Sequence, residues 1–101
     1  MARGKVKVTF SKTGLMKFIS HLDLMRCLQR ALRRADIPVR LTCGYNPHPK
    51  LSFERALRLG VESQKEVVSF TLDKPMALGE LKARFKQQLP EGITIKEVSG
   101  V

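Results

Sequence analysis

Hydrophobic and polar residues alternate near the start of the chain and then change to a helical spacing. Residues 5–10 place an apolar side chain at every second position, which predicts a half-buried strand. Residues 11–14 have the composition of a loop. A helix is predicted over residues 20–35, because Ser20 and Asp23 have the spacing of a capping box at its first turn.

The predicted helix has two chemically different faces. Its apolar face spans an arc of about 120° and carries Leu24, Met25, Leu28, Ala31, Leu32 and Ala35. The opposite side, an arc of about 100°, carries Arg26, Arg30, Arg33 and Arg34. We therefore expect one side to pack against a sheet while the other presents guanidinium groups to solvent.

The rest of the pattern predicts three more extended segments and a second helix. Residues 39–43 alternate again and predict a second strand, and residues 44–50 form a loop stiffened by two prolines. Residues 51–59 fit a strand or a helical turn, and an extended segment is favoured. The remaining predicted elements are a strand at 65–72, a turn at 73–75, a helix at 77–89 and a strand at 93–98.

This order of elements predicts an α+β fold in one domain that covers residues 1–101. The simplest packing is the ferredoxin-like βαββαβ arrangement, a four-stranded antiparallel sheet with two helices on one face. The other face of the sheet is then left open, and it offers a surface for a ligand or a partner.

Composition narrows the class of protein. The chain has 101 residues, of which 43% are hydrophobic and 28% charged, so we expect it to fold. It has no apolar run of the roughly 20 residues that a membrane span needs, and no apolar signal region at its start. Two cysteines cannot form a disulfide framework, which favours a cytoplasmic setting over a secreted or membrane protein.

Positive charge is concentrated in the first sixty residues. The chain has 19 Lys and Arg against 9 Asp and Glu, a net charge of +10. Residues 1–60 contain 13 basic and 3 acidic residues (13 − 3 = +10), and residues 61–101 contain 6 of each (6 − 6 = 0). This distribution favours a polyanion such as RNA, or an acidic protein, as the partner.

The loop 44–50 combines the residue types that bind nucleic acid. Tyr45 can stack on a base, Asn46 can discriminate between bases, and Lys50 can contact a phosphate. Two prolines restrict the backbone on which these side chains stand. The alternative is a plain connection in which Asn46 begins a turn.

His21 stands at the first turn of the predicted helix, where the helix dipole favours anions. Lys12 and Lys17 are close in sequence, which makes a phosphate site plausible; the alternative is a histidine that hydrogen-bonds at the edge of the core. His21 and His48 together also have the chemistry of an acid–base pair that cleaves RNA without a metal. The sequence alone does not decide whether the two imidazoles meet.

No cofactor or metal site is predicted. Cys27 and Cys43 lack the spacing of iron–sulfur or zinc ligands and are expected to be packing residues. Two histidines without an obvious third ligand are poor evidence for a metal site. No nucleotide-binding fingerprint occurs in the chain.

Several motifs, in order along most of the chain, resemble a known family. They are FSKTG at 10–14, FISHLDLMR at 18–26, ALRRA at 31–35, GYNPHPKLSF at 44–53 and LGVES at 59–63. Together they resemble the radical-SAM-linked protein family, a bacterial domain-of-unknown-function family. The resemblance implies the N-terminal half of a longer domain that is found with radical SAM proteins. It marks as candidate site residues His21, Asp23, Asn46, His48 and Lys50.

Three hypotheses follow. The leading one is a non-catalytic module that holds RNA or another polyanion for a partner radical SAM enzyme. No membrane partner is expected. Its binding residues are Arg26, Arg30, Arg33, Arg34, Lys12, Lys17, Tyr45, Asn46 and Lys50. The alternatives are a metal-independent endoribonuclease that uses His21 and His48, and a protein–protein adaptor that docks through the open face of the sheet.

Overall fold

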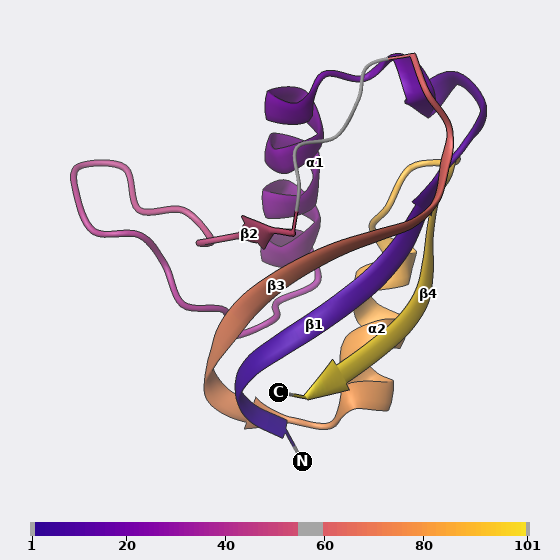
Figure 1. The fold of residues 1–101 in the computed structure, drawn as a ribbon. Coiled ribbons are helices and arrows are strands. Elements are labelled where there is room, and N and C mark those ends of the chain that lie inside the picture. The colour runs from indigo at the N-terminus through magenta and orange to yellow at the C-terminus, as the bar shows by residue number, and fades with distance from the viewer. Residues whose placement is uncertain (1, 55–59, 101) are drawn as a thin grey trace.

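The structure, a computed structural model, describes residues 2–54 and 60–100 (Figure 1). Its elements in chain order are β1 (Ala2–Lys12), the 3-10 helix η1 (Gly14–Phe18), α1 (His21–Arg34), β2 (Ser52–Phe53), β3 (Ser63–Met76), α2 (Leu78–Gln87) and β4 (Ile93–Gly100). The α+β class, the two helices and the four-stranded antiparallel sheet are confirmed.

The four strands form one antiparallel sheet in the order β2-β3-β1-β4. The two long strands, β1 and β3, lie in the centre and pair with Val6 opposite Phe70 and Val8 opposite Val68. The short strand β2 and strand β4 form the two edges. Both helices lie behind the sheet in the view of Figure 1.

The buried apolar side chains of the described residues form one hydrophobic core between the sheet and the helices. Alternate residues of β1 point into it, as the period of a strand requires. The helices contribute residues at helical spacing, Leu24, Leu28 and Leu32 from α1 and Leu81 and Phe85 from α2, all buried. The amphipathic pattern of both segments is therefore predicted correctly, except that Met25, expected on the apolar face of the first helix, is only partly buried and does not join the core.

Ser20 begins α1 as predicted. Its hydroxyl oxygen accepts a hydrogen bond from the backbone N–H of Asp23 at 3.1 Å, which satisfies one amide of the first turn. The helix ends at Arg34 with Ala35 as its C-cap, within one residue of the predicted end. This start and end fix which arginines lie on the solvent side of α1.

The prediction of a strand at 39–43 is wrong. This segment makes only isolated bridges, Val39 to Leu72 and Leu41 to Pro49. The backbone N–H of Thr42 donates to the oxygen of His48 at 2.8 Å, and that of Lys50 donates to the oxygen of Arg40 at 3.0 Å. Residues 40–50 therefore form a separate ribbon, here called the hairpin, and the second strand of the sheet is β2.

Three boundary predictions also differ from the structure. The turn expected at 73–75 lies within β3, which continues to Met76, and residues 11–12, expected in a loop, belong to β1. The extended segment expected at 51–59 contains β2, and its residues 55–59 lie outside the described residues. In the described part of the chain, no helix is long and apolar enough to cross a membrane.

Candidate nucleic-acid interface

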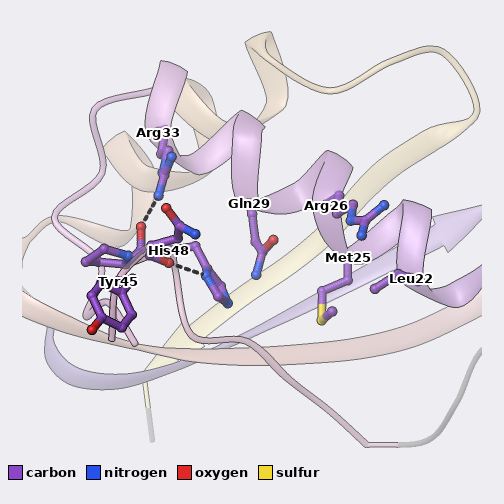
Figure 2. A pocket seen from close by; sticks show the side chains of 9 residues that line it. Leu22, Met25, Arg26, Gln29, Arg33, Tyr45 and His48 are labelled. Carbon is purple, nitrogen blue, oxygen red and sulfur yellow. Dashed lines mark hydrogen bonds between the residues drawn. The ribbon is translucent and has the colours of Figure 1, made fainter. Parts of the chain in front are cut away.

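The hairpin lies against the solvent side of α1 and is held there by two side chains of the helix. The Gln29 side-chain amide donates to the backbone oxygen of Pro49 at 3.0 Å, and the Arg33 guanidinium donates to the backbone oxygen of Pro47. Figure 2 shows both helix residues directed toward the hairpin. These bonds bring the predicted loop next to the predicted arginines.

A groove of about 540 Å³ lies between α1 and the hairpin (Figure 2). We call it the hairpin groove; it is lined by Leu22, Met25, Arg26, Gln29, Arg33, Tyr45, Asn46, Pro47 and His48. A smaller hollow of about 190 Å³ adjoins it and adds Arg30 to four of the same residues. Three guanidinium groups and one imidazole therefore converge on one surface.

Among the described residues, no carboxylate lines either hollow. Asp23 forms an ion pair with Arg26, with 3.9 Å between the carboxylate and the guanidinium and both side chains largely exposed. An exposed pair at that distance contributes little and is easily exchanged for another anion. The surface is therefore cationic and accessible to a polyanion.

Hydrogen bonds of the hairpin orient His48. Its Nδ1 lies 2.9 Å from the backbone oxygen of Asn46, which can only accept, so we assign the proton to Nδ1. The hydroxyl of Thr42 accepts from the backbone N–H of His48 at 3.3 Å. In the neutral ring, Nε2 then keeps its lone pair, and it makes no hydrogen bond in the described part of the chain.

Tyr45 stands at the tip of the hairpin with its side chain fully exposed. Asn46 beside it is also exposed. A tyrosine with no packing role in the fold offers both faces of its ring to a base. The arrangement places a stacking group at the border of the cationic groove.

Five of the nine predicted binding residues line this surface, namely Arg26, Arg30, Arg33, Tyr45 and Asn46. Arg34 is exposed but lines neither hollow. It lies near Cys27, whose thiol pKa is raised by burial and lowered to a lesser extent by the charges of Arg30 and Arg34. A thiol with a raised pKa is a packing residue and a poor nucleophile.

The three predicted lysines lie elsewhere. Lys12 is 1% exposed within the central strand β1, so its side chain is not part of this surface. Lys17 places its ammonium 5.1 Å from the centre of the Phe18 ring in η1, a cation–π contact. Lys50, at the base of the hairpin, lines a different hollow on the sheet.

The two histidines do not share a pocket among the described residues. His21 packs edge-on against the ring of Phe53, with 4.8 Å between ring centres, and lines neither hollow beside the hairpin. His48 lines both. The described structure therefore does not bring together the acid–base pair that an endoribonuclease would need.

Sequence reasoning missed Gln29, which both lines the groove and holds the hairpin. Its position in the sequence could have identified it, because a residue three after Arg26 and four before Arg33 lies on the same side of the helix as both. The prediction considered only the charged residues on that side of the helix and therefore omitted the neutral Gln29.

The described residues contain no group of three His, Cys, Asp or Glu side chains that could hold a metal ion. A comparison with protein-family models matches residues 5–101 to a family described as "uncharacterized protein conserved in bacteria (DUF2344)". The chain belongs to DUF2344. The match confirms a bacterial family of uncharacterised domains, while the link to radical SAM proteins stays a prediction. No curated protein and no solved structure significantly matches this DUF2344 chain.

Proposed function

We propose that this DUF2344 domain binds single-stranded RNA in the hairpin groove. The observation that carries the proposal is the convergence of Arg26, Arg30, Arg33 and His48 on adjoining hollows beside the exposed ring of Tyr45. Guanidinium groups neutralise phosphates, and an exposed aromatic ring stacks on an unpaired base.

Single-stranded RNA fits this surface better than a duplex does. A base can reach Tyr45 only when it is unstacked from its neighbours, as in a loop or a strand end. Arg33 already gives one hydrogen bond to the hairpin, and its guanidinium has further donors for a phosphate. Tyr45 of the hairpin can thus stack on a base while the arginines of α1 beside it contact the phosphates.

The test is the dependence of RNA affinity on salt, measured by fluorescence anisotropy with a labelled single-stranded oligonucleotide. Three phosphate contacts predict a log–log slope of about −2, at roughly 0.7 per contact for a single strand. The double substitution Arg26→Gln with Arg30→Gln reduces the slope to about −0.7. A slope near zero for the unchanged protein would refute the proposal.

A matched control removes the same charge from other surfaces. Lys86 on α2 and Lys96 on β4 are exposed and line neither hollow beside the hairpin. Lys86→Gln with Lys96→Gln therefore lowers the net charge from +10 to +8, as the arginine double substitution does. The control retains the full slope if the arginines bind RNA by position and not only through net charge.

The proposal includes a radical SAM enzyme as the partner for which the RNA is held, in the cytoplasm. The resemblance of the sequence motifs to the radical-SAM-linked family supports this part, and the two free cysteines agree with a reducing compartment. Gel filtration of the purified domain with a radical SAM enzyme from the same organism tests the partner. Separate elution both with and without RNA would refute this part.

We also infer that the fold is the ferredoxin-like arrangement. In the sequence, α1 lies between β1 and β2, and α2 lies between β3 and β4. All neighbouring strands of the sheet are antiparallel. That order supports the split βαβ assignment. An experimental structure that pairs β2 with β1 would contradict it.

A further inference from the structure

A second cationic hollow lies where the base of the hairpin meets the sheet, and nothing in the RNA proposal above uses it. It has a volume of about 240 Å³. We call it the sheet-edge hollow; its polar lining residues are Lys5, Arg40, Lys50, Ser52, Ser69 and Thr71. Three cationic side chains and three hydroxyl-bearing residues therefore line one small space.

The sheet register brings these residues together. Lys5 of β1 lies opposite Thr71 of β3, and Ser52 of β2 lies opposite Ser69. Because Val6 points into the core, its neighbour Lys5 points to the face away from the helices. Lys5 and the β2–β3 edge thus meet on the open face of the sheet.

The hairpin supplies the other two cations. The backbone N–H of Arg40 donates to the oxygen of Thr71 at 2.7 Å, which fixes the hairpin base to β3. The backbone N–H of Lys50 donates to the oxygen of Arg40 at 3.0 Å, so the two residues lie side by side. Their positions are set by backbone bonds and do not depend on flexible side chains.

Most of the positive charge in this hollow is uncompensated. Arg40 uses Nε to contact the Asp73 carboxylate at 3.0 Å, and its two Nη groups make no hydrogen bond in the described part of the chain. Neither Lys5 nor Lys50 forms an ion pair with a described residue. Three cations therefore face one carboxylate.

We propose that the sheet-edge hollow is a phosphate-binding site. A phosphate group has several oxygens that accept at once from guanidinium, ammonium and hydroxyl donors, and the hollow presents all three kinds. A carboxylate has two oxygens in one plane and a single negative charge, so it matches donors that converge from the hairpin, β1 and β2 less well than the tetrahedral, more highly charged phosphate does.

The hairpin connects this site to the hairpin groove. His48 and Lys50 are two residues apart on one strand of the hairpin, and side chains at that spacing point to the same face. We propose that a bound RNA strand follows this face from the arginines of α1 to the sheet-edge hollow. This second statement rests on the proposed RNA function, whereas phosphate binding by the hollow does not.

The first experiment uses inorganic phosphate alone. Phosphate is titrated into the labelled protein at constant ionic strength while backbone amide shifts are followed by NMR, with acetate as the matched anion. We expect saturable shifts at Lys5, Ser52 and Thr71 with phosphate, and their loss in the variant Lys5→Gln with Lys50→Gln. Shifts that do not saturate, equal shifts with acetate, or an unchanged response in the variant would overturn the site.

The second experiment asks which phosphate of an RNA strand the hollow takes. Affinity is measured for one oligonucleotide with a 5′-phosphate and with a 5′-hydroxyl. Tighter binding of the phosphorylated strand assigns the hollow to a strand end, and equal binding assigns it to an internal phosphate. In either case the hollow adds a fourth phosphate contact, so the slope of the unchanged protein becomes about −2.8 and the variant Lys5→Gln with Lys50→Gln returns it to about −2.

If Lys5→Gln with Lys50→Gln keeps the full salt slope, as the control Lys86→Gln with Lys96→Gln does, then one RNA strand does not occupy both the hairpin groove and the sheet-edge hollow. Both lysines of the hollow are exposed, so the variant is expected to fold. If the unchanged protein binds no RNA but phosphate still shifts the amides of the hollow, the proposed function fails and the phosphate site stands. The two proposals can therefore fail separately.

Discussion

The hydrogen bond from Gln29 to the oxygen of Pro49 is the contact whose removal most directly tests how the hairpin is positioned. It joins the middle of α1 to a hairpin residue that is itself buried. The substitution Gln29→Ala removes the donor and keeps a good helix former, so α1 is retained. The hairpin then depends on Arg33 and on its backbone bonds to the sheet.

The expected loss of stability is about 1–2 kcal/mol. A neutral hydrogen bond contributes about 0.5–1.5 kcal/mol, and a buried carbonyl left without a donor adds to that cost. For a domain of this size, each kcal/mol lowers Tm by roughly 4–8 °C. A loosened hairpin also weakens RNA binding, by up to about tenfold if 1.4 kcal/mol of its positioning is lost.

Urea unfolding and amide hydrogen exchange measure this effect. We expect a lower urea midpoint and faster exchange at Thr42 and Lys50, whose N–H groups close the hairpin. The matched control is Gln87→Ala, an exposed glutamine of α2. If Gln29→Ala has the same midpoint and exchange rates as this control, the hairpin is not held by the Gln29 amide.

Three further predictions concern single residues. Tyr45→Ala weakens RNA binding by about 1–3 kcal/mol, roughly 5- to 150-fold, without a change in Tm, while Tyr45→Phe retains binding; equal affinities in anisotropy would contradict a stacking role. Phe85→Ala lowers the free energy of unfolding by about 3–5 kcal/mol in urea because its ring is buried in the core, and Phe85→Leu lowers it less. Cys27 reacts with a thiol reagent at pH 8 more slowly than the exposed Cys43, because burial raises the Cys27 pKa and so reduces its thiolate fraction; equal rates would show that the thiol is not shielded.

The elements that bury a regular face could be predicted from the sequence. The alternation at 5–10 and the arginine and leucine sides of α1 each follow from one period that matches one buried surface. The N-cap at Ser20 was predictable because its signal is local.

The sequence did not predict which other segment an alternating segment pairs with. Residues 39–43 have the alternation of a sheet strand, but a short hairpin gives the same alternation. Pro75 predicted a turn, yet it lies in β3 next to a register shift between β1 and β3, where a missing N–H is tolerated. Lys12 is buried because β1 continues between β3 and β4, which its charge did not indicate.

The candidate site shows the same division. The arginines and the loop were identified from composition, but their meeting depends on the hairpin and on Gln29. Lys5, Arg40 and Lys50 come from three separated segments, and only the register of the strands brings them together.

Both bonds that fasten the hairpin to α1 end on main-chain oxygens, those of Pro47 and Pro49. Every amino acid carries such an oxygen, so the attachment does not depend on which side chains stand between the two anchoring points and the tip. Cys43, Tyr45 and Asn46 are exposed and can therefore be exchanged without loosening the support, whereas Gly44, at a φ of 126°, has to stay glycine. The domain is in this respect a scaffold for selection, in which a library of tip sequences would alter ligand preference while the underlying framework stays constant.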